Sequence, residues 1–302
     1  MAVVSRITAV AAVLFCSGNP PCHSSFISRR NEDTGETPLI REKLPTLLAK
    51  FAISMALVLG TLGCQATPII APAAISPEAS RRYVIHLPGM AGWIKPDSNL
   101  VQGLADANVA GHYEIYDWTG PHWMIGAVWA YEDNRAQARH IADRIAAKLR
   151  QQPDAQIVLT GWSAGCAVAI WALEDLPDGV MVQSVLLVQP AVDPDHDLTH
   201  ALRHVRRHLY ATQSGGDSIM LGIGTLIFGT TDGGAHVIAA GNSGFHKPPA
   251  GDVAEYRKLV EIPYQSEWSK YHDFGGHAGP TEREFAKEVL GPMVINDAER
   301  RR

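Results

Sequence analysis

One stretch of the chain constrains the fold more than any other, the segment from Ile157 to Ile170. Its first part, Ile157–Thr160, is short, apolar and β-branched, which is typical of a buried strand, and the apolar run after Ala164 is typical of a helix. Between them lies the turn Gly161-Trp-Ser-Ala-Gly165. A serine at the apex of such a turn takes a strained backbone conformation, and glycines two positions before and after it relieve the crowding where strand and helix cross. The segment therefore predicts a strand, a sharp turn that presents Ser163, and a helix.

The rest of the body continues this alternation from Arg81 onward. Further strands are expected at Arg82–Leu87, His112–Tyr116, Val182–Val188, Leu209–Thr212 and Lys258–Tyr264. Helices are expected at 99–108, between Arg135 and Leu149, at 164–174, at 195–207 and at 281–290, the last closed by Gly291 and Pro292. Because parallel strands need such crossovers, the predicted class is α/β, with a mostly parallel sheet of about six strands flanked by helices.

Composition narrows the range of functions. The chain has 302 residues, of which 46% are hydrophobic and 19% charged, enough for one large α/β domain or two small ones. The net charge of −5 leaves no basic field of the kind that nucleic-acid binding requires. Of the four cysteines, Cys166 is alone in the main body, so a disulfide within the domain is not expected.

The first 63 residues read as a leader. Arg41, Lys43 and Lys50 precede an apolar run, Phe51–Leu62, whose length suits a signal segment better than a membrane span of about 20 residues. The run ends at Gly60-Thr-Leu-Gly-Cys64, which resembles a bacterial lipobox except that threonine stands at 61, where leucine is more usual. A lipidated Cys64 is the first reading; a simple secretory signal, an uncleaved anchor or a cytoplasmic chain are the alternatives.

The expected organisation is therefore a leader over 1–63 with its signal segment at about 41–63, a tether over 64–80 and an α/β domain over 81–302. The tether is rich in alanine, proline and isoleucine. On this reading the protein is exported, and is either a membrane-anchored lipoprotein of the cell envelope or a periplasmic or secreted protein.

The turn at Ser163 matches the pattern G-x-S-x-G, and aspartate and histidine candidates follow it in the chain. Strand, elbow, helix and this order resemble the α/β-hydrolase superfamily over about Arg82 to Pro292, with a reduced number of N-terminal strands. The resemblance implies a serine hydrolase of the esterase or lipase kind, without a metal or an organic cofactor. A serine hydroxyl needs a base to take its proton and a third group to orient that base.

His277 is the first candidate for the base. It stands in Phe274-Gly-Gly-His-Ala-Gly, between the last strand and the last helix, where the superfamily places its catalytic imidazole. His272 and His246 remain alternatives. For the acid, Asp217 follows the strand Leu209–Thr212 through a Gly-Gly turn, and Asp193 and Asp232 are its rivals. Each of these aspartates has the plainer interpretation of capping a turn.

Two backbone N–H groups are needed to stabilise the oxyanion of a tetrahedral intermediate. One is expected from Ala164, directly after the nucleophile. By resemblance the other comes from the first loop, His86-Leu-Pro-Gly-Met-Ala-Gly, and is assigned to Met90, although Leu87 and Pro88 interrupt the usual His-Gly pair. Trp162 is expected to pack beneath the cleft, and Cys166 to be a small buried residue.

Two features fall outside this scheme. His196, His200, His204 and His208 recur every four residues and are expected to form a solvated helix face, with metal binding as the alternative. The glycine-rich excursion over 218–249 is expected to pack as structure or to form a partial cap. The predicted function is an exported hydrolase of small-molecule or lipid carboxylic esters; thioesters, amides or acyl transfer would use the same residues, and a non-catalytic surface-anchored binding lipoprotein is the alternative of another class.

Overall fold

The computed structural model describes residues 76–120, 130–214 and 239–299, all within the compact unit Gly60–Arg302. The predicted leader, Cys64, Asp217 and Asp232 lie outside the described residues. Six strands form one parallel sheet: β1 (Arg82–Leu87), β2 (His112–Ile115), β3 (Gln156–Trp162), β4 (Ser184–Val188), β5 (Leu209–Gln213) and β6 (Leu259–Pro263). The predicted fold class is confirmed.

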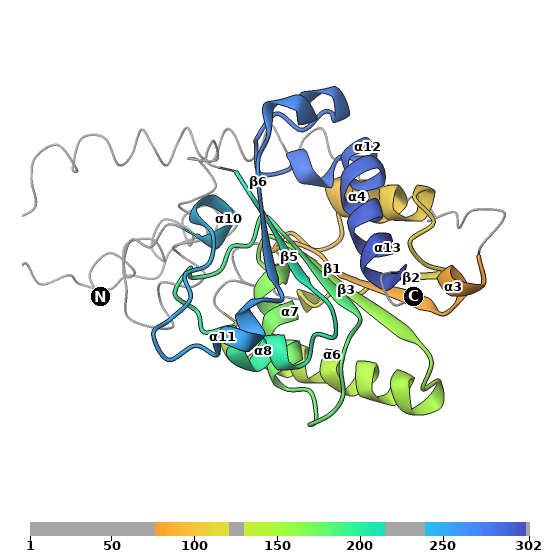
Figure 1. Ribbon diagram of the computed structural model, residues 1–302, viewed down its shortest axis with the longest axis vertical. Helices are drawn as coiled ribbons and strands as arrows, with labels where there is room; N and C mark the ends of the chain where they lie inside the picture. Colours follow the sequence, from red (N-terminus) through yellow and green to blue (C-terminus); the bar gives the residue numbers. More distant parts are fainter. Residues whose placement is uncertain (1–75, 121–129, 215–238, 300–302) are drawn as a thin grey trace, which may run out of the picture. The chain divides into compact units, whose positions relative to one another are not determined.

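The strand order is β2-β1-β3-β4-β5-β6 (Figure 1). From β1 the chain moves outward to β2, then returns past β1 to β3 and continues in the other direction. Right-handed crossovers then place the helix after β1 on one face and those after β2, β3 and β4 on the other. The strand order reverses between β1 and β3, and in open α/β sheets ligands bind outside the carboxyl ends of the strands at such a point. The loops after β1 and β3 lie at that point.

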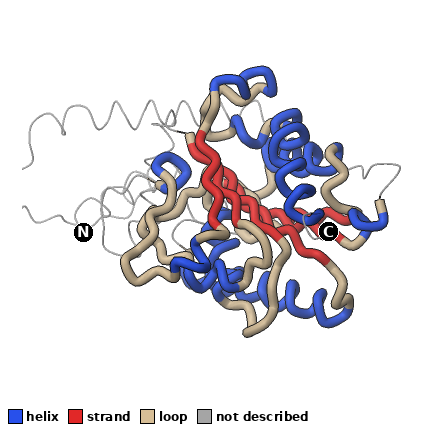
Figure 2. The backbone as a smooth tube through the Cα atoms, viewed as in Figure 1, coloured by secondary structure: helices blue, strands red, loops and turns tan. Residues whose placement is uncertain are grey.

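Helices cover both faces of the sheet (Figure 2). On one face lie α6 (Tyr131–Gln151), α7 (Gly165–Glu174) and α8 (Thr199–Arg203), and on the other α4 (Lys95–Asp106), α12 (Arg283–Phe285), the π-helical turn η4 (Ala286–Leu290) and α13 (Gly291–Glu299). Shorter elements are α3 (Pro77–Ser80), α10 (Ala240–Ser243), α11 (Val253–Tyr256), η2 (Ser266–Tyr271) and η3 (Gly279–Thr281). In the described part of the chain no helix is both long and apolar enough to cross a membrane.

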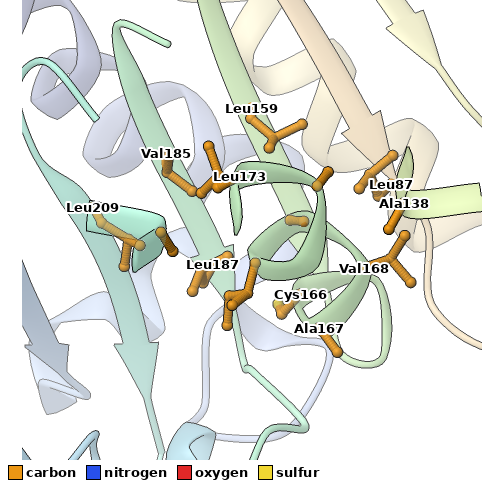
Figure 3. Packing of buried hydrophobic residues seen from close by; sticks show 14 of the residues in the cluster. Leu87, Ala138, Leu159, Cys166, Ala167, Val168, Leu173, Val185, Leu187 and Leu209 are labelled. Atoms are coloured by element: carbon orange, nitrogen blue, oxygen red, sulfur yellow. The ribbon is translucent and has the colours of Figure 1, made fainter. Parts of the chain in front are cut away.

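The two cores arise from the alternation of side chains along each strand. Leu159 and Leu187 point toward α7, where they pack with Cys166 and Leu173 (Figure 3). Ile85 of β1 belongs to the same cluster. Their neighbours in the strands point to the other face and pack with α4 and the C-terminal helices; these are Val84, Val158, Leu186 and Val188. Burial on both faces explains why the strands are continuous apolar runs rather than alternating ones.

The helix expected at 195–207 is wrong in extent, because only α8 is helical there. After α8 the chain pairs with the segment before β4. Val205 forms a parallel β-bridge with Val182, and the N–H of Arg206 donates to the carbonyl of Val182. These pairings replace the helical hydrogen bonds, so the four histidines do not share a helix face. His204 is buried and pairs through Nδ1 with the carbonyl of Val180, at 2.7 Å.

The helix expected to close at Gly291 and Pro292 instead runs on as α13. Gly291 has helical dihedral angles, and a Cβ there would come within 3.0 Å of the Cβ of Ala107. The glycine therefore permits close packing against the end of α4 rather than ending the helix. The π-helical turn precedes Pro292, whose ring and missing N–H disrupt regular α-helical bonding.

Three other boundaries differ from expectation. Within the predicted tether, α3 forms a turn of helix whose Ala79 is buried and accepts a hydrogen bond from the N–H of Gly111. Helix α4 begins at Lys95 rather than Asn99, because the carboxylate of Asp97 accepts the N–H of Ile94 at its first turn. Of the excursion, residues 239–249 are described, and α10 packs against the loop after β4.

Candidate active site

Ser163 occupies the apex of the turn between β3 and α7. Its φ is +53°, the left-handed region that an L side chain rarely adopts. Its N–H donates to the carbonyl of Val188 at 2.9 Å, and its carbonyl accepts the N–H of Ala191 at 3.2 Å. The end of β4 thus holds the strained residue in place. Ser163 is 5% exposed.

The two glycines of the turn are required by sterics, as the sequence predicts. A Cβ at Gly161 would lie 2.7 Å from the carbonyl oxygen of Gly165. A Cβ at Gly165 would come within 3.0 Å of the carbonyl oxygens of both Leu87 and Pro88, at the end of β1. The first turn of α7 therefore touches the loop that follows β1, so the loop that carries Met90 lies beside the turn that carries Ala164.

The β1–α4 loop, residues 88–94, lies against Ser163. A Cβ at Gly89 would sit 3.8 Å from the Cβ of Ser163 and 3.2 Å from the Trp162 ring. The N–H of Gly92 donates to the carbonyl of Gly89 at 3.0 Å, which closes a tight turn around Met90. Among the described residues, none accepts a hydrogen bond from the N–H of Met90 or of Ala164.

Trp118 anchors this loop from outside. Its indole N–H donates to the carbonyl of Pro88 at 2.7 Å, and the side chain is buried. The residue before it, Asp117, accepts the N–H of Thr119 at 3.0 Å and lies 3.4 Å from the N–H of Trp93. The segment after β2 thus supports the loop after β1, a contact that no local pattern in the sequence indicates.

A buried network underlies the loop as well. His86, in β1, pairs through Nδ1 with Thr160 Oγ1 at 2.7 Å and through Nε2 with Asp97 Oδ1 at 3.0 Å. Because a carboxylate only accepts, Nε2 carries the hydrogen. The side chains of His86 and Asp97 are 0% exposed. Sequence reasoning missed this network; its one signal was a histidine inside an otherwise apolar strand.

His277 lies beside the elbow. Its carbonyl accepts the indole N–H of Trp162 at 3.3 Å, and the two ring centroids are 5.6 Å apart. Trp162 is buried, as the sequence predicts, and it packs against the histidine loop. The structure therefore brings the segment of His277 to the residue that precedes Ser163.

The histidine loop is also bound to the end of β5. The hydroxyl of Ser214 donates to the carbonyl of Gly275, and the N–H of Gly275 donates to Asp273 Oδ1 at 2.9 Å. Burial raises the pKa of the Asp273 carboxyl above its ordinary value, which the hydrogen bond from Gly275 offsets in part. Asp217 follows Ser214 by three positions and itself lies outside the described residues.

The alternative candidates for the base and for the acid make different contacts. His272 is exposed and has a φ of +64° at the end of η2. His246 pairs with Asp195 at 3.0 Å on the surface. Asp193 accepts the N–H of Asp195 at 2.8 Å and so caps its own turn.

Cys166 and His196 both make contacts with neighbouring elements of the fold. Cys166 is fully buried, its thiol donates to the carbonyl of Gly161, and burial raises the pKa of that thiol well above its usual range. His196 pairs with Glu174 at 2.7 Å. No group of three or more His, Cys, Asp or Glu side chains suited to a metal ion occurs within the described residues.

No family model and no curated protein sequence matches the chain. Solved structures with a similar fold include a cutinase-like protein from Cryptococcus sp., with 15% identity and a TM-score of 0.42, covering 74% of this chain and 98% of that one. A serine hydrolase without a lid from Xanthomonas campestris has 13% identity and a TM-score of 0.41, covering 76% and 86%. An esterase domain from Rhodothermus marinus has 15% identity and a TM-score of 0.40, covering 75% and 90%. Similarity at this level assigns neither residues nor substrate to this chain.

Proposed function

We propose that the protein is a serine hydrolase that cleaves carboxylic esters through an acyl-enzyme on Ser163. The observation that carries the proposal is the conformation of that residue. A φ of +53° at a non-glycine residue costs free energy, and it is retained here on a turn whose flanking glycines leave no room for a side chain. Such strain at a buried residue that follows the carboxyl end of a parallel strand is typical of a residue kept for chemistry.

In the proposed reaction Ser163 Oγ attacks the carbonyl carbon of the ester while His277 takes its proton. The N–H groups of Met90 and Ala164 stabilise the negative oxygen of the tetrahedral intermediate. Collapse breaks the bond to the alkoxide, which leaves with the proton from His277. A water molecule, deprotonated by His277, then attacks the acyl-enzyme and releases the acid and Ser163. Asp217 would orient the imidazole throughout.

Two features support the assignment of His277 and Asp217. Trp162, next to the nucleophile, holds the main chain of His277 by a hydrogen bond. Ser214, three residues before Asp217, is hydrogen-bonded to the same loop at Gly275. Ser214 is therefore attached to the histidine loop, and Asp217 follows it by three positions in the sequence.

The decisive experiment is labelling of the purified protein with a fluorophosphonate, which phosphonylates an activated serine and releases fluoride. We expect one equivalent on Ser163 and none in Ser163→Ala, with circular dichroism used to verify that the variant is folded. Labelling that persists in Ser163→Ala would assign the nucleophile elsewhere. A folded wild-type protein that never labels would favour the non-catalytic binding lipoprotein.

The substrate class is tested separately, because thioesters, amides and acyl acceptors would engage the same groups. p-Nitrophenyl esters of graded acyl length, matched thioesters and matched anilides should be compared by kcat/KM. We expect the esters to be turned over fastest. A higher kcat/KM for the thioester series, or product formed only with an added alcohol acceptor, would contradict ester hydrolysis as the principal activity.

We also propose that the protein is exported and anchored by lipid at Cys64. The support is the sequence alone: a basic segment, an apolar run of about a dozen residues and Gly60-Thr-Leu-Gly-Cys64. In a bacterial host given a clickable fatty acid, the wild-type chain should incorporate label and partition into detergent, and Cys64→Ala should not. Equal incorporation by the Cys64→Ala chain would reject lipidation at this residue.

A further inference from the structure

The carboxylate of Asp97 contacts both ends of the β1–α4 loop. Its Oδ1 accepts Nε2–H of His86, the second residue before the loop, at 3.0 Å. Its Oδ2 accepts the N–H of Ile94, the last residue of the loop, at 3.0 Å. One side chain therefore fixes the distance between the two ends of the segment that carries Met90.

The same network reaches the strand of the nucleophile. The other ring nitrogen of His86 pairs with Thr160 Oγ1 at 2.7 Å, across the register in which β1 lies beside β3. Thr160 precedes Ser163 by three residues. The imidazole of His86 thus connects two strands. One is β1, which leads into the loop of the proposed donor Met90, and the other is β3, which leads into Ser163 and the other proposed donor, Ala164.

We infer that Thr160, His86 and Asp97 form a positioning network that sets the geometry of the oxyanion site. They are positioning residues rather than catalytic ones, because all three side chains are buried and His86 contacts both of the others. The inference rests on the proposed function; it gives His86 of the loop pattern a role and adds Thr160 and Asp97, which neither a catalytic triad nor that pattern identifies.

The chemistry of the network suits this task better than apolar packing would. A buried carboxylate paired with a buried imidazole is costly to desolvate, and similar apolar residues would often give equal or greater stability. Hydrogen bonds are directional, however, so they fix the relative position of β1, β3 and α4 in a way that apolar contacts do not. Displacements of about 1 Å in a catalytic site can cost up to roughly 100-fold in rate.

Thr160→Val is the best test, because it removes one hydroxyl at nearly constant volume and leaves the His86–Asp97 pair intact. Thr160→Ser restores the hydroxyl. Tyr113→Phe is the matched control, because it also removes one hydrogen-bonded hydroxyl. The Tyr113 hydroxyl accepts the N–H of Ala110 at 2.8 Å and donates to the carbonyl of Leu104 at 3.1 Å. It lies near the amino end of β2, whereas Ser163 follows the carboxyl end of β3. All three proteins should be compared with the wild type for Tm, kcat and KM on one p-nitrophenyl ester.

A second readout isolates the oxyanion site. An alkyl trifluoromethyl ketone adds to the serine as a charged tetrahedral adduct, whereas the matching alcohol binds without an oxyanion. For Thr160→Val we expect kcat to fall roughly 10-fold, with KM within about twofold of the wild-type value. The ketone should bind roughly 10-fold more weakly, and the affinity for the alcohol should be unchanged. These losses are smaller than the loss of roughly 100-fold or more that is typical when one oxyanion donor is removed. Thr160→Ser should recover most of the loss.

The outcomes separate the two proposals. If the wild-type protein does not react with a fluorophosphonate, the proposed function fails and the positioning role fails with it. If the wild type reacts but Thr160→Val lowers Tm as Tyr113→Phe does and keeps the wild-type kcat and ketone affinity, the network is structural only and the inference alone is overturned. Equal weakening of the ketone and the alcohol would likewise reject a role at the oxyanion.

Discussion

The indole N–H of Trp162 donates to the carbonyl oxygen of His277 across 115 positions of sequence, at 3.3 Å. The residue beside the nucleophile thereby holds the main chain of the proposed base. Because Nε1 is the only hydrogen-bonding group of a tryptophan side chain, replacing it with phenylalanine removes the bond and keeps most of the packing.

For Trp162→Phe we expect kcat on a p-nitrophenyl ester to fall roughly fivefold with little change in KM, since one such bond contributes about 1 kcal/mol. Trp171→Phe is the matched control, because that tryptophan packs at the outer end of α7 over Arg135. A kcat for Trp162→Phe equal to that of Trp171→Phe would mean that the bond does not hold the base.

A methyl group at Gly165 should be incompatible with the native fold. Its carbon would collide with two backbone carbonyl oxygens, at Leu87 and Pro88, which cannot rotate away as a side chain would. We expect Gly165→Ala to lose about 3 kcal/mol of unfolding free energy or more, measured by urea denaturation. Gly276→Ala is the control for stability, because a Cβ there meets nothing within 4 Å. Similar midpoints for the two variants would contradict the close approach of α7 to the end of β1.

The thiol of Cys166 should be inert while the protein is folded. It is fully buried and donates to the carbonyl of Gly161, and its pKa is raised by burial, so little thiolate is available to react. Maleimide labelling of the Cys166 peptide, followed by mass spectrometry, should occur at the rate of unfolding and increase with urea. Rapid labelling in native buffer, at the rate of an exposed thiol, would show that the site opens.

The sheet and the elbow could be predicted from the sequence because their signals are local. Buried parallel strands appear as apolar runs, and the glycines at 161 and 165 follow from the turn itself. The end of α8 could not be predicted, because it is set by the pairing of Val205 with Val182, a contact outside the helical segment. Gly291 has the residue type of a helix end, yet its role is contact with Ala107.

The candidate site likewise has parts that the sequence predicts and parts that it does not. The positions of Ser163 and His277 follow from a motif and from chain order, and the structure brings the segment of His277 to the elbow through Trp162. The network of Thr160, His86 and Asp97 joins three separate elements, so no periodicity or spacing contains it. Asp217 and the Met90 donor remain predictions.

Asp273 should make the protein less stable as the pH rises. Its folded-state pKa is raised, first by burial and also by the charge of Glu282, so the unfolded chain ionises at lower pH than the folded one. Stability is then unaffected below the ordinary aspartate pKa, falls as the pH passes through the folded value and stays reduced above it. Asp273→Asn keeps an acceptor for the N–H of Gly275 and removes the buried charge. We expect this variant to match the wild type near pH 3 and to exceed it in unfolding free energy at pH 7.

Asp106, the last residue of α4, provides a control of opposite sign. Its hydrogen bond with Arg283 lowers the pKa of the Asp106 carboxyl, so its contribution is present at neutral pH and is lost as the pH falls through the folded value. Asp106→Asn should therefore be less stable than the wild type at pH 7, with the difference disappearing in acid. Urea titrations from pH 3 to pH 8 would reveal both trends. Parallel curves for Asp273→Asn and the wild type over that range would mean that the Asp273 carboxylate is solvated in the folded protein.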